Sequence, residues 1–175
     1  GVNTRLQRSA SANAIVVGDS VYLVDAGDPA LPQLTAAGLQ LSQVRAIFIT
    51  HHHQDHTAGL MPLLGVRWMT SVKGSLQVHG PAGLSAVARG FSEAMRPSVA
   101  IGIGKTADPL PDVTMKEIGA PGLIFADANL RVIAVENTHF TSLPVAADKK
   151  PKSYAFRVET AAGSVVFTGD SAVSD

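Results

Sequence analysis

The sequence contains no cysteine, so disulfide bonds and thiolate metal sites are excluded. It also lacks an excess of either charge, because 14 Lys and Arg residues balance 14 Asp and Glu residues. A neutral chain has no general electrostatic attraction to nucleic acid or to anionic lipid. No apolar run approaches the roughly 18 residues that a membrane-spanning helix needs. We therefore disfavour nucleic acid as a partner and expect no membrane span.

The remaining composition is that of a folded protein. Of the 175 residues, 46% are hydrophobic and 16% are charged, which is typical of a globular chain and not of a disordered one. This length suits one domain with a buried core. No repeat or change of composition divides the chain, so we expect a single domain over residues 1–175.

The most informative stretch is 47–60, where an apolar run ends in His51, His53, Asp55 and His56. Imidazole nitrogens and carboxylate oxygens are the groups that bind zinc and similar ions. In extended backbone, residues i and i+2 point the same way, so His51 and His53 can hold one ion. The chain then turns, which leaves Asp55 and His56 for a second ion. A histidine tag is disfavoured because tags lie at termini.

Two later segments repeat this arrangement of a ligand-type side chain just after a strand. The predicted strand 130–135 is followed by His139, and the predicted strand 165–168 is followed by Asp170. Asp25 also follows a predicted strand, and two interpretations of it stay open. Its carboxylate either supports the metal site by accepting hydrogen bonds or simply forms a turn. We interpret His79 as a packing or surface histidine.

The rest of the pattern gives a coarse map of mixed elements. We predict strands at 13–17, 20–24, 45–50, 76–78, 113–118 and 154–159. We predict helices at 32–41, at 57–64 with Pro62 as an interruption, and at 84–95. The stretch 97–111 is rich in glycine and proline and predicts a loop, either near the mouth of the active site or as a flexible insertion.

The pattern His51-x-His53-x-Asp55-His56, with His139 and Asp170 after it, resembles the signature of the metallo-β-lactamase superfamily. The segments Gly-Pro-Ala-Gly-Leu at 80–84 and Ser-Tyr-Ala-Phe-Arg at 153–157 resemble its ribonuclease Z-like and related arylsulfatase- or phosphodiesterase-like branch. The resemblance implies an α+β fold, a four-layer αββα sandwich. Two β-sheets would pack face to face with helices outside, and we expect this sandwich to be incomplete here.

The resemblance also implies a site with two zinc ions, for which manganese or iron are alternatives. The first ion would take His51, His53 and His139, and the second would take Asp55 and His56. Asp170 would bridge both ions, together with a water that they activate as hydroxide. Asp55 would in addition orient this nucleophile or pass a proton to the leaving group, which makes it the predicted catalytic residue.

This chain departs from the family at one point, because no histidine follows His139. Family members supply one more histidine to the second metal, downstream of the bridging aspartate. We therefore expect a chain trimmed at both ends that lacks the last metal histidine. A homodimer in which the partner completes the site is the alternative.

The leading functional hypothesis is a zinc-dependent hydrolase that cleaves a small phosphodiester or a sulfate ester. A β-lactamase or lactonase is the alternative within the enzyme class. An alternative of another class is a non-catalytic metal- or partner-binding protein built on a hydrolase-like domain. Transfer RNA processing is disfavoured, because a neutral chain offers little attraction for phosphates.

Overall fold

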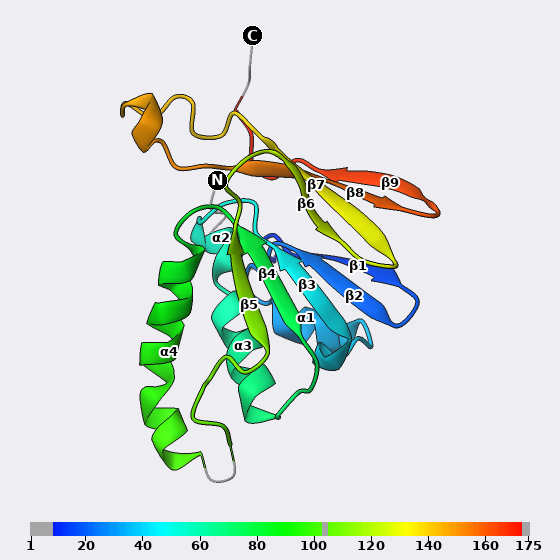
Figure 1. The fold of residues 1–175 in the computed structure, drawn as a ribbon, viewed down its shortest axis with the longest axis vertical. Helices are drawn as coiled ribbons and strands as arrows, with labels where there is room; N and C mark the ends of the chain where they lie inside the picture. The colour runs from blue at the N-terminus through cyan, green and yellow to red at the C-terminus, as the bar shows by residue number, and fades with distance from the viewer. Residues whose placement is uncertain (1–8, 103–104, 173–175) are drawn as a thin grey trace.

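The computed structural model describes residues 9–102 and 105–172 as two β-sheets and one layer of helices. Figure 1 shows the helices, the first sheet and the second sheet as successive layers. The first sheet contains, in order, β1 (Asn13–Val17), β2 (Ser20–Val24), β3 (Val44–Phe48), β4 (Leu76–Gly80) and β5 (Val113–Glu117). The second contains β6 (Gly122–Ala126), β7 (Leu130–Glu136), β8 (Tyr154–Thr160) and β9 (Gly163–Phe167).

The two sheets differ in how their strands pair. In the first sheet β1 and β2 form an antiparallel hairpin, whereas β2, β3, β4 and β5 are parallel neighbours. The second sheet is antiparallel throughout. Parallel strands need crossover connections, and these connections supply the helices α1 (Ala30–Ala36), α2 (Gln54–Thr57), α3 (Leu60–Met69) and α4 (Leu84–Ile101). Two short 3₁₀ helices are η1 (Leu41–Gln43) and η2 (Ala147–Lys149).

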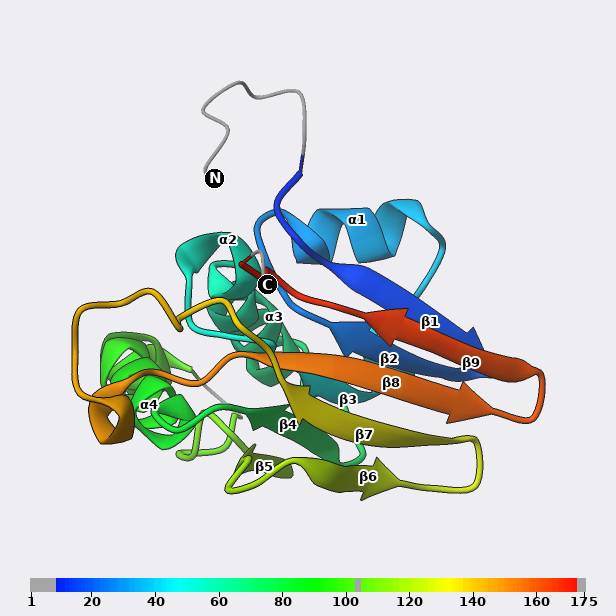
Figure 2. The same ribbon diagram turned by 90° about the horizontal axis from the view of Figure 1, so that it is seen from above.

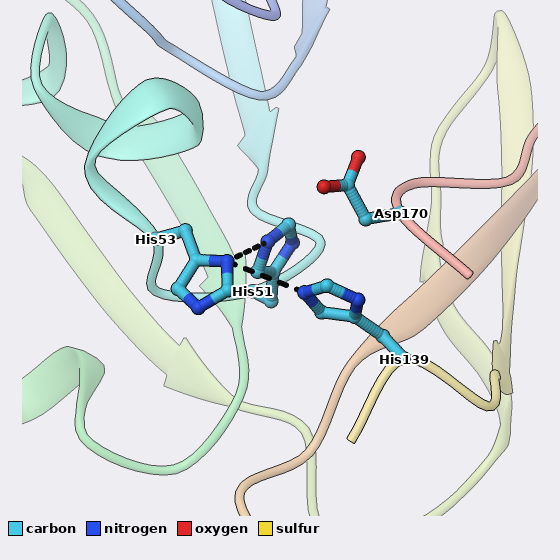
Figure 3. Close-up of side chains that lie close together, drawn as sticks. All are labelled: His51, His53, His139 and Asp170. Carbon is cyan, nitrogen blue, oxygen red and sulfur yellow. Dashed lines mark hydrogen bonds between the residues drawn. The ribbon is translucent and has the colours of Figure 1, made fainter. Parts of the chain in front are cut away.

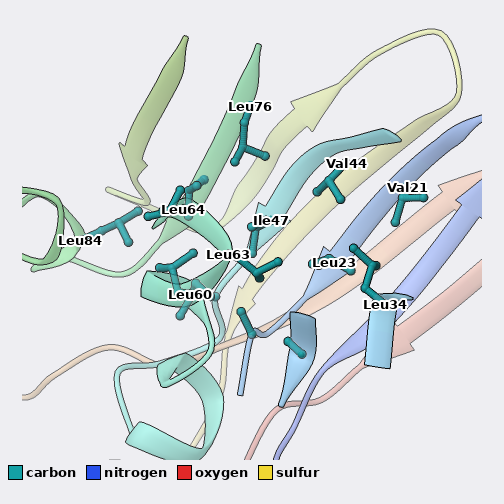
Figure 4. Packing of buried hydrophobic residues seen from close by; sticks show 14 of the residues in the cluster. Val21, Leu23, Leu34, Val44, Ile47, Leu60, Leu63, Leu64, Leu76 and Leu84 are labelled. Carbon is teal, nitrogen blue, oxygen red and sulfur yellow. The ribbon is translucent and has the colours of Figure 1, made fainter. Parts of the chain in front are cut away.

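One hydrophobic core lies between the helices and the first sheet. Figure 4 shows leucine and isoleucine side chains of α1, α3 and the sheet meeting in this layer. The central strand β3 is buried on both faces, as its unbroken apolar run predicts. Its side chains Ile47 and Phe48 point to opposite sides of the sheet, Ile47 into this core and Phe48 into the other.

The second core fills the space between the two sheets. Tyr22 and Phe48 of the first sheet meet Phe125 and Phe156 of the second, with ring centroids 5.5–6.0 Å apart. Such tilted and edge-on aromatic pairs add to the free energy of apolar burial. In the second sheet, strand β7 alternates, with buried Leu130, Val132 and Ala134 facing inward.

The predicted α+β sandwich is confirmed for these layers. The helices α1, α3 and α4 lie on the outer side of the first sheet (Figures 1 and 2). In the described part of the chain, no α-helix covers the outer side of the second sheet. None of the helices that the structure describes is long and apolar enough to cross a membrane.

Several predicted boundaries differ from the structure. The helix predicted at 57–64 is two helices, and Pro62 lies in the first turn of α3, where a missing N–H costs nothing. Helix α4 continues through Pro97 to Ile101, so this proline lies inside the helix and does not end it. The sequence prediction missed β6.

The loop after α4 is not at the mouth of the site. Thr106 accepts a hydrogen bond from the Trp68 indole near the C-terminal end of α3, at 3.1 Å. Figure 1 places this loop at the opposite end of the molecule from α2. The prediction was wrong because α4 carries the chain about 27 Å along the sheet before the loop begins, at 1.5 Å per residue.

His79 is a packing histidine of the second core, as predicted. Its ring is 2% exposed and packs against Phe48 and Phe125 at centroid distances of 5.4 and 5.7 Å. Burial, and secondarily the positive charge of Lys116, lower the pKa of His79 to about 4. The folded protein therefore holds this ring neutral.

We predict that His79 makes the metal-free protein sensitive to acid. Below pH 6.5 the unfolded chain binds a proton that the folded chain does not bind until about pH 4. Stability is therefore fully present above pH 6.5 and is lost as the pH falls toward 4. Between pH 7.5 and 5, the free energy of unfolding should fall in both proteins. The fall should be about 2 kcal/mol smaller in His79→Phe than in the wild type. Parallel pH profiles in urea unfolding would contradict this.

Candidate metal centre

The first group of site residues follows β3, in the segment that leads from Phe48 through Thr50 to His51. The Thr50 hydroxyl donates to the Asp25 carboxylate at 2.9 Å, so its oxygen is free to accept from His51 Nδ1–H at 3.0 Å. This arrangement leaves His51 Nε2 without a proton. Burial, and then the neighbouring imidazoles His56, His139 and His53, lower the pKa of His51 to about 4. His51 thus presents a neutral nitrogen with a free lone pair.

Three imidazoles from two parts of the chain converge on one point. His51 Nε2 lies 3.1 Å from His53 Nδ1, and His53 Nδ1 lies 3.2 Å from His139 Nε2 (Figure 3). His53 Nδ1 carries at most one proton, so it cannot donate a good hydrogen bond to both His51 and His139. A cation at this point would instead be coordinated by the lone pairs of all three nitrogens. Ligand atoms about 2.0–2.1 Å from a tetrahedral zinc are themselves about 3.3 Å apart. The observed spacing fits such an ion.

A carboxylate completes this set. One donor atom each from His51, His53, His139 and Asp170 lie within 4.8 Å of one another, and we call these residues the four-donor group. Figure 3 shows His51 and His53 on one segment of the chain, with His139 and Asp170 approaching them from two other segments. Imidazole and carboxylate without thiolate form a donor set typical of zinc and of similar divalent ions.

His56 and Asp55 lie beside this group without belonging to it. His56 Nδ1 donates to Asp25 at 2.7 Å, which turns Nε2 toward Asp170 Oδ1 at 3.4 Å. Burial is the largest single influence on His56 and opposes its charge, but the hydrogen bond to Asp25 together with the negative charges of Asp25, Asp170 and Asp55 raises the pKa of His56. Asp55, His56 and Asp170 line one cavity of about 680 Å³, in which a second ion would have these three donors.

Asp25 connects both halves of the site. It is 1% exposed and accepts hydrogen bonds from the Thr50 backbone N–H at 2.8 Å, the Thr50 hydroxyl, His56 and the Ser11 hydroxyl at 3.3 Å. Its backbone also has a φ of 62°, a left-handed conformation that aspartate tolerates better than most residues. Asp25 therefore combines a left-handed backbone with hydrogen bonds from Thr50 and His56, and its support of a bound metal stays a prediction.

Backbone contacts hold α2 against the turn that follows Asp25. The N–H of Ala26 donates to the His56 carbonyl at 2.8 Å, and the N–H of Gly59 donates to the Ala26 carbonyl at 2.8 Å. The N–H of Ser11 donates to the Asp55 carbonyl at 3.0 Å. A Cβ at Gly27 would lie 2.2 Å from the Asp55 carbonyl oxygen, so only glycine permits this approach.

Sequence reasoning missed three residues that shape the site. Thr50 bonds both Asp25 and His51, Asn137 bonds the loops that carry His139 and Asp170, and the ring of Phe140 lies 4.4 Å from that of His139. Each is a neighbour in sequence of a predicted ligand. This adjacency is the only sequence signal that could have identified them as site residues, because none has a side chain that binds metal strongly.

We predict that Gly27→Ala loosens the site. The new methyl group would meet the Asp55 carbonyl, and backbone atoms cannot move aside cheaply. The free energy of unfolding should fall by about 1–3 kcal/mol, and zinc affinity should fall with it.

Gly90→Ala is the matched control for this substitution. Gly90 lies in α4 with no atom within 4 Å of an added Cβ, so alanine there should stabilise by about 0.5–1 kcal/mol. Chemical unfolding and zinc titration of both variants provide the check. Equal behaviour of the two would contradict the packing argument.

Comparison with known proteins agrees with this geometry. The family model of the metallo-beta-lactamase superfamily matches residues 7–175. Ribonuclease Z from Mycobacterium sp. (strain KMS) is 30% identical over 168 residues, which are 94% of this chain and 56% of that protein. Ribonuclease Z from Brevibacillus brevis is 33% identical over 150 residues, 85% of this chain and 44% of that protein.

Solved structures share the fold. The short form of human tRNase Z superposes with a TM-score of 0.72 at 22% identity, covering 97% of this chain and 65% of that chain. The metallo-beta-lactamase fold protein YhfI from Bacillus subtilis gives 0.69 at 19% identity, covering 97% and 58%. The chain thus spans little more than half the length of the curated relatives from Mycobacterium.

The names of these proteins correct one prediction. We expected a small-molecule substrate and disfavoured nucleic acid, but ribonuclease Z and tRNase Z are named for RNA. That prediction was wrong because it used net charge, which averages over the whole chain and says nothing of local contacts. The resemblance drawn from the motifs is confirmed. The chain belongs to the metallo-β-lactamase superfamily and resembles its ribonuclease Z-like branch.

Proposed function

We propose that this chain carries the metal-binding core of a zinc-dependent hydrolase that cleaves phosphodiester bonds in RNA. The observation that carries the proposal is the four-donor group at the strand ends, in a chain whose curated relatives are named ribonuclease Z. Phosphodiester hydrolysis suits such a site, because it requires charge stabilisation and an activated water more than a covalent nucleophile.

The donors support an assignment of ligands. His51, His53 and His139 would hold one ion, Asp55 and His56 would hold the other, and Asp170 would be shared. Zinc is favoured because imidazole and carboxylate suit it, with manganese or iron as alternatives. When bound, two such ions supply Lewis-acid activation of water and of the phosphate group.

The chain itself keeps these donors oriented. Thr50 and Asp25 fix the Nδ1 protons of His51 and His56, so that Nε2 of each ring faces the site. Hydrogen bonds of this kind raise the basicity of a ligating imidazole and restrict its rotation. The Phe140 ring lies edge-on to His51 and His53, at centroid distances of 5.8 and 5.4 Å, and packs against both rings.

Asp55 is the residue to which we assign proton transfer. Its side chain is partly exposed and lines the same cavity as His56 and Asp170, next to where a phosphate would enter. A carboxylate there can hold the attacking water in line and return a proton to the departing oxygen. The cavity is wide enough for a phosphate and its adjoining sugar, at about 680 Å³.

A second candidate is a non-catalytic metal-binding protein. It is favoured by the fact that the four-donor group is complete without Asp55 and His56. Such a protein would bind one ion firmly and leave RNA intact. The two candidates make opposite predictions for Asp55, which allows one substitution to separate them.

We predict that Asp55→Ala in the full-length protein lowers the rate of RNA cleavage by at least about 100-fold, within the usual range for acid–base residues. The metal held by the three histidines should remain, because Asp55 is outside the four-donor group. Turnover of a single-stranded RNA oligonucleotide and metal content by elemental analysis are the measurements. Asp19→Ala, in the exposed β1–β2 turn, is the matched control and should be unchanged.

Two results would contradict the proposal. Full turnover in Asp55→Ala with normal metal content would remove Asp55 from the mechanism. A zinc-loaded wild type that cleaves no RNA, whether single-stranded or a transfer RNA precursor, would contradict the RNA substrate.

A further inference from the structure

Asn137 lies where two ligand-bearing loops meet. It is the first residue after β7 and precedes His139 by two positions, and its side chain reaches the segment that leads from β9 to Asp170. Its amide oxygen accepts the His139 backbone N–H at 3.1 Å, and its amide nitrogen donates to the Thr168 carbonyl at 2.9 Å. One side chain therefore links the loop of His139 to the loop of Asp170.

The carboxamide of Asn137 is suited to both bonds, because it carries an acceptor and a donor on two separate atoms. The His139 N–H is a donor and requires an acceptor, while the Thr168 carbonyl is an acceptor and requires a donor. These two partners also determine the orientation of the Asn137 amide, with its oxygen toward the His139 N–H and its nitrogen toward the Thr168 carbonyl. Aspartate could keep the bond to His139, but its carboxylate would face the Thr168 carbonyl without a proton to donate.

The backbone of Asn137 is itself firmly held. Its N–H donates to the Ser153 carbonyl at 2.9 Å, and the neighbouring Tyr154 N–H donates to the Thr50 carbonyl at 3.0 Å, directly before His51. The amide side chain thus extends a chain of contacts from the end of β3 to the end of β9. A parallel bond joins the same two loops, from the Thr138 hydroxyl to the Ala172 carbonyl at 2.8 Å.

Burial cannot fix these two donors in place. The Asp170 side chain is 40% exposed and His139 is only partly buried, unlike His51, which is 0% exposed. Their separation therefore depends on hydrogen bonds between the loops. If both loops are already ordered in the metal-free protein, metal binding does not have to offset the conformational entropy lost on ordering them. This is the advantage of a preorganised site.

We propose that Asn137 is a positioning residue that sets the separation of His139 and Asp170 and thereby the affinity of the site for metal. The inference rests on the proposed function, since it takes His139 and Asp170 as ligands. Asn137 does not belong to the four-donor group, so we assign it an indirect role through His139 and Asp170. Supporting residues of this kind typically change metal affinity by about 10–100-fold.

The experiment compares Asn137→Ala and Asn137→Asp with Asn129→Ala as the matched control. Asn129 also uses its amide as a hydrogen-bond donor, to the Tyr22 hydroxyl at 2.8 Å, but lies in the β6–β7 turn away from the site. Zinc affinity is measured by competition with a chelator, and cobalt(II) substitution reports ligand geometry through its visible spectrum. Thermal unfolding of the metal-free forms measures stability.

The proposal predicts that both Asn137 variants bind zinc at least about 10-fold more weakly than the wild type and show altered cobalt spectra. The aspartate variant is decisive. If Asn137 only stabilised a local turn, aspartate would preserve that turn and zinc affinity would be kept. The added negative charge of aspartate would by itself favour binding of a cation. Weaker zinc binding by Asn137→Asp would therefore identify the lost hydrogen bond to Thr168 as the cause. Asn129→Ala should lower the unfolding temperature and leave zinc affinity unchanged.

Two outcomes overturn the inference, and they are distinguishable. Wild-type zinc affinity and cobalt spectrum in Asn137→Asp would leave only a local role for Asn137, while the proposed function stands. A wild-type protein that binds no zinc would overturn both the inference and the proposed function.

Discussion

The carboxylate of Asp25 is the interaction on which the candidate site depends. It is buried and accepts hydrogen bonds from Thr50 and His56, two groups from the segment after β3. A buried carboxylate without hydrogen-bond partners would raise the free energy of the folded state. The hydrogen bonds to Asp25 therefore restrict the orientations of Thr50 and His56. Through them the ring nitrogens of His51 and His56 are presented to the site in one tautomer. The left-handed backbone of Asp25 and the glycine at 27 bring α2 close enough for this to happen.

The two-sheet architecture supplies the rest of the geometry. His51 and His53 follow a strand of the first sheet, whereas His139 and Asp170 follow strands of the second. The aromatic core between the sheets fixes the distance across which these side chains meet. The hydrogen bond from Tyr154 to Thr50 ties the two sheets together beside the site. The donors are thus positioned by packing that lies mostly outside the site.

Much of this was predictable from local sequence, and the limits have physical causes. The alternation of His51 and His53 after an apolar run predicted their common direction. The resemblance to the family, together with their places after strands, predicted that His139 and Asp170 would join them. The bounds of α3 and α4 were not predictable from Pro62 and Pro97, because a proline's effect depends on its position in the helix and on tertiary packing. The supporting roles of Thr50 and Asn137 arise from contacts between distant segments. No single stretch of sequence contains that information.

The most direct test of the account is the structure of the protein with zinc, by crystallography or X-ray absorption. The account predicts one ion bound by Nε2 of His51, Nδ1 of His53 and Nε2 of His139, at Zn–N distances of about 2.0–2.1 Å, with an oxygen of Asp170 in its coordination sphere. Zinc bound elsewhere on the chain, with these three imidazoles diverging, would contradict it.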